Sequence, residues 1–448
     1  MNSRYTSRPL RGALSAAVLS VITACAGESI PLTGVEPATD AFGERSAASV
    51  AASSGSLQLV SATLTGAAAR SGSTTCQLSA DGTLLLFASD ASNLVNGDTN
   101  GASDLFLRNL TTGITTRVTT GSTGAQLATG GHCTGTTMTP DGRLVAFNTG
   151  TAGGTVFVKN TQTGALTQAS PAIGSIPQVT GFFGGVLSDD GRSVVFKTVP
   201  AQVYRGAYQW DNVVPARLML RDLNTGSLIT LPTDNGNAAN GEVQGSRFAI
   251  SPDGTRVAFA SSSSTLVSGD TNGRADLFVL DLSNNTVTLA SSTSAGIPAT
   301  GGGTYWTPTF VSNTQLSFGT GSVSSLGDRG FYLKDLNSGA LTLVLRDTDG
   351  GSTAVLSGDA RFVVFSSNYS GFNARVFMRD LSTGVHTVVS ANSSGTASNG
   401  SSTGAVISRN GSRVAFGSNA SNLVTPRPPS GVFQIYVKSL AAGVTLAP

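Results

Sequence analysis

Residues 248–290 read FAISPDGTRVAFASSSSTLVSGDTNGRADLFVLDLSNNTVTLA, and this stretch decides the fold. Four short apolar runs are separated by three turn signals: Asp253-Gly254, the polar loop 261–276, and Ser283-Asn284-Asn285. An Asp-Gly pair favours a tight hairpin because these residues accept a positive φ. Short apolar runs between such turns predict four antiparallel strands within about 43 residues.

The same unit recurs seven times along the chain, which is the mark of a repeat architecture. The first anchor is a turn followed by an aromatic residue. It occurs as Asp81…Phe87, Asp141…Phe147, Asp190…Phe196, Asp253…Phe259, Asn313…Phe318, Asp359…Phe365 and Asn410…Phe416. The second anchor is the third strand of each unit. It reads LFLRNL at 105–110, VFVKN at 156–160, LMLRDL at 218–223, LFVLDL at 277–282, FYLKDL at 331–336, VFMRDL at 376–381 and IYVKSL at 435–440.

One four-stranded sheet cannot bury both of its faces, whereas sheets stacked radially bury them and protect their edges. We therefore expect an all-β protein, a seven-bladed β-propeller of four-stranded antiparallel blades, over residues 57–448. Two segments are candidates for the strand that closes the ring. One is 57–61 before the first repeat and the other is 444–447 after the last, and either or both could serve.

The two anchors together form a longer motif. It is S-x-D-G-x-x-x-x-F, followed by hydrophobic-Phe/Tyr-hydrophobic-Arg/Lys-Asp-Leu-x-x-G. This motif resembles the TolB-like β-propeller repeat, a WD-repeat-like family, from about Gln58 to the end of the chain. The amino-terminal α/β domain of TolB has no counterpart here. The resemblance therefore implies the fold but not TolB's specific role.

Residues 1–24 resemble a bacterial lipoprotein signal peptide. A basic start precedes an apolar stretch of about ten residues, too short for the ~20 that a transmembrane helix needs. The stretch ends at Ile22-Thr23-Ala24-Cys25, which is similar to a lipobox and implies lipidation of Cys25. The alternative is an ordinary secretory signal with a chance cysteine.

Ala26 follows the cysteine, and in lipoproteins the lack of an acidic residue there implies the outer membrane. The resemblance thus implies an exported protein attached to the cell envelope by its lipid anchor. Residues 25–56 are rich in Ala, Ser, Gly, Pro and Glu without apolar periodicity, which indicates a flexible tether.

The charge balance argues against a nucleic-acid partner. Only 12% of residues are charged, and the chain has no basic block. Without the three arginines of the leader, 24 basic residues face 25 acidic ones. Two further cysteines, Cys76 and Cys133, each precede the first strand of consecutive blades. In an oxidising compartment they could form a disulfide, and the alternative is two separately buried thiols.

The loops of a propeller alternate between two faces, and the length variation here lies in the inter-blade loops and the connections between second and third strands. Because loops on a rigid scaffold carry function, we expect this loop-rich face to bind a protein, peptide or glycan. Aromatic residues in these loops are the candidate ligand contacts, although they could instead pack the loops down: Phe182, Phe183, Tyr204, Tyr208, Trp210, Tyr305 and Trp306.

Two loops share an acidic motif, LVNGDTNGASDLF at 94–106 and LVSGDTNGRADLF at 266–278. Hard oxygen ligands around a glycine turn suit Ca²⁺, although the EF-hand glycine and distal Glu are missing. The alternative is that Asp and Asn cap their own loop backbone. Calcium is therefore the one cofactor hypothesis, with these candidate ligands: Asp98, Asn100, Asp104, Asp270, Asn272 and Asp276.

The sequence contains no recognisable catalytic constellation. Its two histidines, His132 and His386, lie in different repeats. A G-x-S-x-G match at 400–404 lies in a linker between strands rather than on a strand–turn–helix. The leading hypothesis is therefore a non-catalytic binding scaffold in the cell envelope. The alternative is a carbohydrate-active lyase or hydrolase that uses Asp residues and calcium, because propellers also support enzymes.

Overall fold

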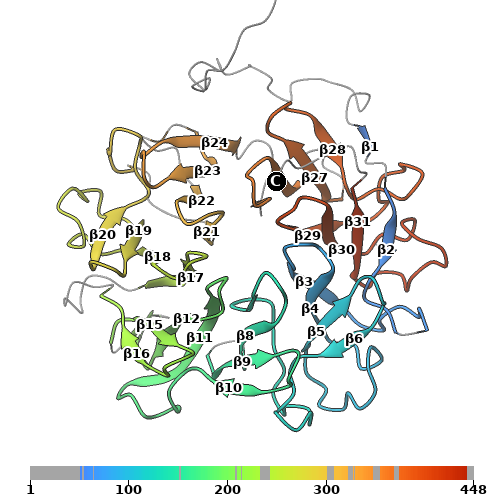
Figure 1. Ribbon diagram of the computed structural model, residues 1–448, viewed down its shortest axis with the longest axis horizontal. Coiled ribbons are helices and arrows are strands. Elements are labelled where there is room, and N and C mark those ends of the chain that lie inside the picture. The colour runs from blue at the N-terminus through green and yellow to red at the C-terminus, as the bar shows by residue number, and fades with distance from the viewer. Residues whose placement is uncertain are drawn as a thin grey trace, which may run out of the picture. The chain divides into compact units, whose positions relative to one another are not determined.

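The seven repeats fold into seven four-stranded sheets, which confirms the predicted all-β, seven-bladed propeller (Figure 1). The computed structural model describes residues 51–52, 55–63, 65–150, 153–206, 209–212, 214–232, 243–299, 307–320, 326, 328–346, 354–367 and 373–440. The strands within each blade pair antiparallel and follow the order of the sequence. Each blade thus corresponds to one repeat, except that the seventh borrows a strand.

The first three blades contain these strands: β3 (Ser73–Leu78), β4 (Leu84–Ser89), β5 (Asp104–Asn109) and β6 (Thr115–Arg117) in blade 1; β7 (Thr137–Met138), β8 (Leu144–Asn148), β9 (Val156–Asn160) and β10 (Leu166–Gln168) in blade 2; β11 (Val179–Leu187), β12 (Ser193–Pro200), β15 (Leu218–Asp222) and β16 (Leu228–Thr230) in blade 3. A separate hairpin, β13 (Gln202–Gly206) and β14 (Gln209–Asn212), occupies the insertion between β12 and β15.

The remaining blades contain these strands: β17 (Val243–Ile250), β18 (Arg256–Ser261), β19 (Asp276–Asp281) and β20 (Thr286–Leu289) in blade 4; β21 (Thr309–Phe310), β22 (Gln315–Thr320), β23 (Gly330–Asp335) and β24 (Leu341–Arg346) in blade 5; β25 (Ala354–Leu356), β26 (Phe362–Ser367), β27 (Arg375–Asp380) and β28 (His386–Val388) in blade 6; β29 (Ser402–Ile407), β30 (Arg413–Ser418) and β31 (Gln434–Ser439) in blade 7.

The ring is closed by the segment that precedes the first repeat. Strand β2 (Leu57–Leu59) pairs antiparallel with β31 and becomes the outer strand of blade 7 (Figure 1). The alternative closing segment, 444–447, lies outside the described residues. Strand β1 (Ala51–Ala52) pairs parallel with β28, so these two residues of the predicted tether pair with blade 6.

The two sequence anchors meet inside the blades. In six blades the aromatic residue of the second strand faces an aromatic residue of the third, and in blade 3 Phe196 faces Met219 instead. Phe87 pairs with Phe106 across β4 and β5, with ring centroids 5.5 Å apart. Phe259 pairs with Phe278 in blade 4 in the same way, at 5.9 Å. Such aromatic pairs contribute about 0.5–1.5 kcal/mol beyond the burial of their area. The recurrence of the anchors thus reflects an aromatic contact in the core of six of the seven blades.

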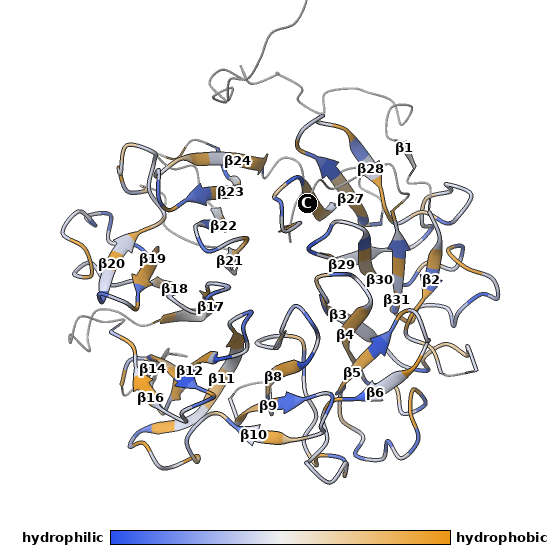
Figure 2. Cartoon of the chain, in the orientation of Figure 1, coloured by the Kyte–Doolittle hydropathy of each residue, from blue (hydrophilic) through white to orange (hydrophobic). Residues whose placement is uncertain are grey.

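In blades 1, 2, 3, 5 and 7, the Arg or Lys of the third-strand motif joins its blade to the preceding one. Figure 2 shows hydrophilic arrowheads on third strands such as β9 and β23, between apolar segments. These cations donate to backbone carbonyls just after the outer strand of the blade before: Arg108 to Ala62, Lys159 to Thr120 and Gly121, Arg221 to Ala169, Lys334 to Ser292 and Thr293, and Lys438 to Ala391 and Asn392. Blade 4 has Leu280 at this position.

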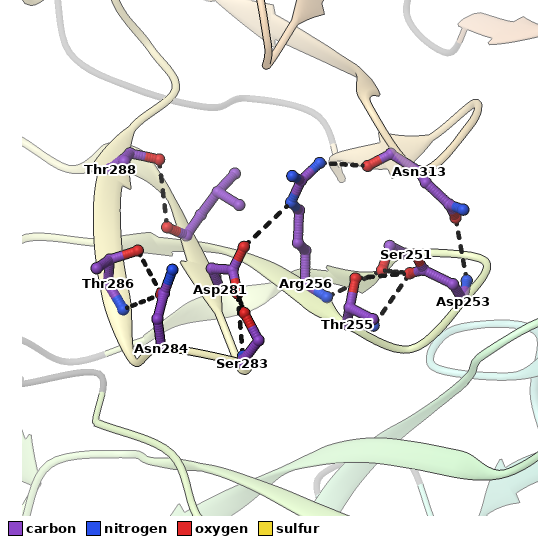
Figure 3. Close-up of polar contacts among 11 residues, drawn as sticks. Ser251, Asp253, Thr255, Arg256, Asp281, Ser283, Asn284, Thr286, Thr288 and Asn313 are labelled. Atoms are coloured by element: carbon purple, nitrogen blue, oxygen red, sulfur yellow. Dashed lines mark hydrogen bonds and ion pairs between the residues drawn. The ribbon is translucent and has the colours of Figure 1, made fainter.

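The turn between the first and second strands is held by one recurring set of hydrogen bonds. Ser251 donates from its hydroxyl to the Asp253 carboxylate at 2.6 Å and accepts from the backbone N–H of Arg256 at 2.9 Å (Figure 3). The same Ser or Thr to Asp or Asn bond recurs in five other blades: Ser79–Asp81, Thr139–Asp141, Ser188–Asp190, Ser357–Asp359 and Ser408–Asn410. The Ser-x-Asp-Gly motif is therefore a turn-forming motif.

These turns also bond to one another around one end of the propeller. Asp253 donates its backbone N–H to the Asn313 side chain at 3.1 Å, and Arg256 donates to the Asn313 carbonyl at 2.8 Å (Figure 3). An ion pair of 2.5 Å joins Arg409 of blade 7 to Asp189 of blade 3, two blades that are not neighbours in the ring. This end of the central channel is therefore crossed by protein side chains.

Replacing one inter-blade cation tests its contribution to stability. Lys334 is 5% exposed, so Lys334→Met leaves the buried carbonyls of Ser292 and Thr293 without their donor. We expect a loss of about 1–3 kcal/mol in the free energy of unfolding, measured by urea denaturation. The exposed Arg192→Met is the matched control and should change stability by less than about 0.5 kcal/mol. Equal effects of the two variants would contradict this role.

Candidate functional site

A pocket of about 520 Å³ opens on the loop-rich face, opposite the bonded turns. It is built from strand ends of blades 1 and 7 and from the loop that enters blade 2. Its described lining comprises Gly72, Ser73, Thr74, Thr75, Ala88, Ser89, Asp90, Ser103, His132, Cys133, Thr134, Thr403, Gly404, Gly417 and Phe433. The pocket therefore lies on the face that the variation in loop length predicts to bind.

A disulfide between Cys76 and Cys133 crosses from β3 to the loop before β7 at the wall of this pocket. It joins blades 1 and 2 and closes a loop with a sequence separation of 57 residues. A covalent link of this kind restricts the unfolded chain most when the loop is long. The structure thus contains the bridge that was one of the two sequence interpretations of these cysteines.

The blade 7 side of the pocket is joined to blade 1 by hydrogen bonds. The backbone N–H of Ser73 donates to the Phe433 carbonyl at 3.0 Å. The Thr75 hydroxyl donates to the Gly404 carbonyl. Because these bonds and the disulfide together link the three blades that form it, the pocket has walls that are held in place before any ligand binds.

The lining is rich in hydroxyl groups and poor in charge. Ser and Thr side chains come from blades 1 and 7 and from the loop that enters blade 2, and Phe433 supplies one aromatic ring. Among the described lining residues Asp90 is the one acid and His132 the one imidazole, and no Lys or Arg is present. Such a surface suits a polar ligand that forms many neutral hydrogen bonds, and it lacks a cation to neutralise an anionic one.

The structure assigns different surroundings to the aromatic residues predicted from the loops. Phe182 is 1% exposed and stacks edge-on against Phe196 at 5.7 Å, so its surroundings match the packing alternative. Phe183 is half-buried in β11, opposite Lys197. Tyr204 and Trp210 are backbone partners in the β13–β14 register. The other three, Tyr208, Tyr305 and Trp306, lie outside the described residues. Neither Phe182 nor Phe183 is among the described residues that line the pocket.

The pocket residues Asp90, Phe433 and Thr403 are not among the candidates from the sequence. Phe433 and Thr75 are over 300 positions apart in the chain and meet only because β2 closes the ring beside blade 1. No local motif marks such a meeting. The one signal available was the pair of cysteines, which already placed blades 1 and 2 side by side.

The acidic loop of blade 1 is balanced by a positive charge from the same blade, Arg117 at the end of β6. Asp104 is fully buried and accepts hydrogen bonds from the Thr119 hydroxyl and, at 2.8 Å, from the Gln126 amide. Asp98 forms an ion pair of 3.5 Å with Arg117 and also accepts from Gln126 at 2.9 Å. Asn100 accepts from the backbone N–H of Ala102, as an Asx turn would. The Asn100 contact is of the kind that the capping alternative expects, whereas Asp98 and Asp104 are bonded by side chains outside their loop.

The acidic loop of blade 4 is bonded differently. Asp276 is fully buried and accepts from the Ser291 hydroxyl at 2.7 Å and from the Asn272 amide at 2.5 Å. Asp270 is 5% exposed, yet neither of its carboxylate oxygens has a hydrogen-bond partner. Burial therefore raises the pKa of Asp270, against the nearby backbone N–H of Asn272.

The described part of the chain contains no group of three or more His, Cys, Asp or Glu side chains placed to hold a metal ion. Within the same residues, no helix is long and apolar enough to cross a bilayer.

Removing the disulfide should weaken both the fold and the pocket. For a loop of 57 residues, we expect Cys76→Ser combined with Cys133→Ser to lower the free energy of unfolding by about 4 kcal/mol. Urea denaturation of the oxidised wild type and the double variant measures this difference. Adding a reductant should destabilise the wild type by a similar amount and leave the variant unchanged. An effect of the reductant on the variant would contradict the assignment.

Comparisons with known proteins show the fold alone. No family model matches the sequence, and no curated protein matches it either. An oligogalacturonate lyase in complex with manganese matches with a TM-score of 0.53 and 14% identity, over 88% of this chain and 99% of the lyase. TolB from Acinetobacter baumannii matches with a TM-score of 0.35 and 14% identity, over 75% of this chain and 76% of TolB. The chain therefore shares the propeller fold of the lyase, and an identity of 14% does not extend to activity.

Proposed function

We propose that the chain is an exported, lipid-anchored propeller that binds a neutral glycan in the pocket between blades 1, 2 and 7. The observation that carries this proposal is the pocket itself, with its hydroxyl-rich lining and a covalent bridge in its wall. In this interpretation the protein is a binding scaffold in the cell envelope, and it positions its ligand without transforming it.

The chemistry of the lining supports a sugar over a charged ligand. Glycans present many hydroxyls, which pair with the more exposed lining side chains of Thr74, Thr134 and Thr403, while Phe433 offers an apolar ring for the faces of the sugar. Asp90 adds a strong acceptor, since hydrogen bonds to a charged acceptor are about twice as strong as neutral ones. An acidic glycan would bring carboxylates toward Asp90 with no cation in the lining to offset the repulsion.

Two observations support an extracytoplasmic location. The leader that ends at Cys25 resembles a lipoprotein signal, as described above. A disulfide between Cys76 and Cys133 persists in an oxidising compartment and is rare in the cytosol. Lipidation at Cys25 would hold the protein at the envelope, and the outer membrane is the site that Ala26 favours.

Ligand binding tests the pocket directly. We expect a neutral oligosaccharide from an envelope glycan panel to bind the purified protein, with Phe433→Ala and Asp90→Asn each lowering its affinity about tenfold or more. Calorimetric titration measures the affinities. Two matched controls lie away from the pocket: Ile229→Ala, an exposed apolar residue on β16, and Asp222→Asn, at the turn between β15 and β16. Both should bind as the wild type does.

Other outcomes would replace this function. Binding of peptides but of no glycan would make the partner a peptide and reject the glycan proposal. The alternative of a carbohydrate-active enzyme predicts turnover, so the same protein is incubated with oligogalacturonate and with neutral oligosaccharides, and unsaturated or shortened products are sought. Product formation that is lost in Asp90→Asn would show an enzyme rather than a binding scaffold.

The lipid anchor gives a separate prediction. In cells that express the full chain, the protein should fractionate with the membrane, and mass spectrometry should find an acylated amino-terminal cysteine at position 25. Cys25→Ser should remove the acyl group and move the protein to a soluble fraction. Wild-type protein that stays soluble with an unmodified Cys25 would contradict the anchor without touching the pocket.

A further inference from the structure

Blade 4 contains a pair of buried carboxylates that no ion pair among the described residues neutralises. Asp270, in the loop between β18 and β19, is 95% buried, and both of its carboxylate oxygens lack a hydrogen-bond partner. Asp276, at the start of β19, is fully buried and near enough that the charge of Asp270 raises its pKa. No ion pair to either carboxylate is found among the described residues.

Blade 1 shows what is missing, because the same motif there has two additional partners. Arg117, opposite Phe106 in the β5–β6 register, forms an ion pair with Asp98. Gln126, bridged to Thr120, donates to both Asp98 and Asp104. These two residues are the guanidinium and the amide that satisfy the pair of carboxylates.

The corresponding positions in blade 4 carry residues that can do neither. Leu289 is opposite Phe278 in the β19–β20 register, where blade 1 has Arg117. Pro298 is bridged to Ser292, where blade 1 has Gln126. The other polar residues of the loop are similar in the two blades. Ser291 and Asn272 donate hydrogen bonds to Asp276, and Thr119 and Asn100 occupy the equivalent positions in blade 1. Blade 4 therefore keeps the acidic loop and lacks its positive charge.

Two adjacent buried carboxylates without a cation are strongly unfavourable, because burial penalises each charge and the charges repel each other. Burial first, and then the neighbouring carboxylate, raise the pKa of Asp276 against the hydrogen bonds from Ser291 and Asn272. Such a pair needs either a bound cation or a proton. We infer that blade 4 binds one Ca²⁺ between the carboxylates of Asp270 and Asp276, where the metal takes the place that Arg117 has in blade 1.

The donor set suits Ca²⁺ in particular. Both unpartnered oxygens of Asp270 are available, and each oxygen of Asp276 has a second lone pair beyond the one that accepts a hydrogen bond. Loop carbonyls and water complete the shell, since Ca²⁺ accepts six to eight oxygens in irregular geometry. Mg²⁺ demands a near-ideal octahedron and keeps its waters, so a site with two buried carboxylates in a loop favours the larger ion.

Calorimetry and thermal unfolding of the purified protein, stripped with EDTA, test this site. Calcium chloride at pH 7 should give a binding isotherm with one site. At about 100-fold above Kd it should raise Tm by about 3 °C. Asp270→Asn should abolish the isotherm and the shift. In EDTA the same variant should melt above the wild type, because one buried charge is gone.

Blade 1 supplies the matched control and a gain-of-partner variant. Asp98→Asn breaks the ion pair with Arg117, so it should lower Tm with and without calcium and leave the calcium isotherm unchanged. Leu289→Arg with Pro298→Gln copies the blade 1 residues into blade 4. This double variant should lose calcium binding and melt above the wild type in EDTA.

Three results would overturn the inference. No calcium isotherm at millimolar concentration would do so, as would an isotherm that survives Asp270→Asn. The third is neutralisation by a proton. A proton that neutralises Asp270 would remove the penalty of its buried charge, so the melting temperatures of wild type and Asp270→Asn in EDTA would then converge as the pH is lowered. Convergence on acidification, together with a Tm at pH 7 that is indifferent to calcium, would show that a proton satisfies the pair.

Discussion

The contact on which this propeller depends is the hydrogen bond from a buried cation to the carbonyls of the neighbouring blade. Each sheet satisfies its own backbone groups internally, but the chain that leaves an outer strand presents carbonyls with no strand beside them. Lys159 donates hydrogen bonds to the carbonyls of Thr120 and Gly121 at 3.0 and 3.1 Å. Lys438, which is fully buried, donates to the Ala391 carbonyl in the same way. A buried carbonyl without a hydrogen-bond donor would cost about 1–3 kcal/mol. Each of these cations therefore holds its own blade against the outer strand of the preceding blade.

The length of the loops is constrained differently on the two faces of the propeller. On one face the short turns bond to each other, and Arg409 reaches across to Asp189, so their lengths are constrained. The inter-blade loops and the connections between second and third strands lie on the opposite face. Insertions such as β13–β14 and the pocket beside the Cys76–Cys133 bridge occur there. The constrained face supports the fold, and the variation in loop length is found on the other face.

The fold could be predicted from the sequence because its motifs repeat. The pocket could not be predicted, because its lining residues belong to no repeated motif. Phe87 and Phe106 belong to anchors that recur in register, so strand order followed from the pattern alone. Two segments could close the ring from the sequence, and β2 pairs with β31 through a long-range contact that no motif encodes. Phe433 and Thr75 line one pocket only through that closure.

The acidic loops show why a motif by itself does not define a site. The polar residue that begins the third strand is bonded in three different ways in blades 7, 1 and 4. Gln434 in blade 7 is neutral, accepts from Ser61 at 2.6 Å and donates to the Ala69 carbonyl at 2.9 Å. Asp104 in blade 1 belongs to a carboxylate pair that Arg117 offsets.

Asp276 in blade 4 belongs to a carboxylate pair that no described side chain offsets. The motif letters of blades 1 and 4 are nearly identical, and their difference lies at Arg117 and Leu289, outside the motif. In a buried site the deciding residue is the one that supplies the opposite charge, because desolvation makes an uncompensated carboxylate far more unfavourable than any lost turn contact. The search for ligand sites in repeat proteins should therefore compare the counter-charges of equivalent loops, blade by blade.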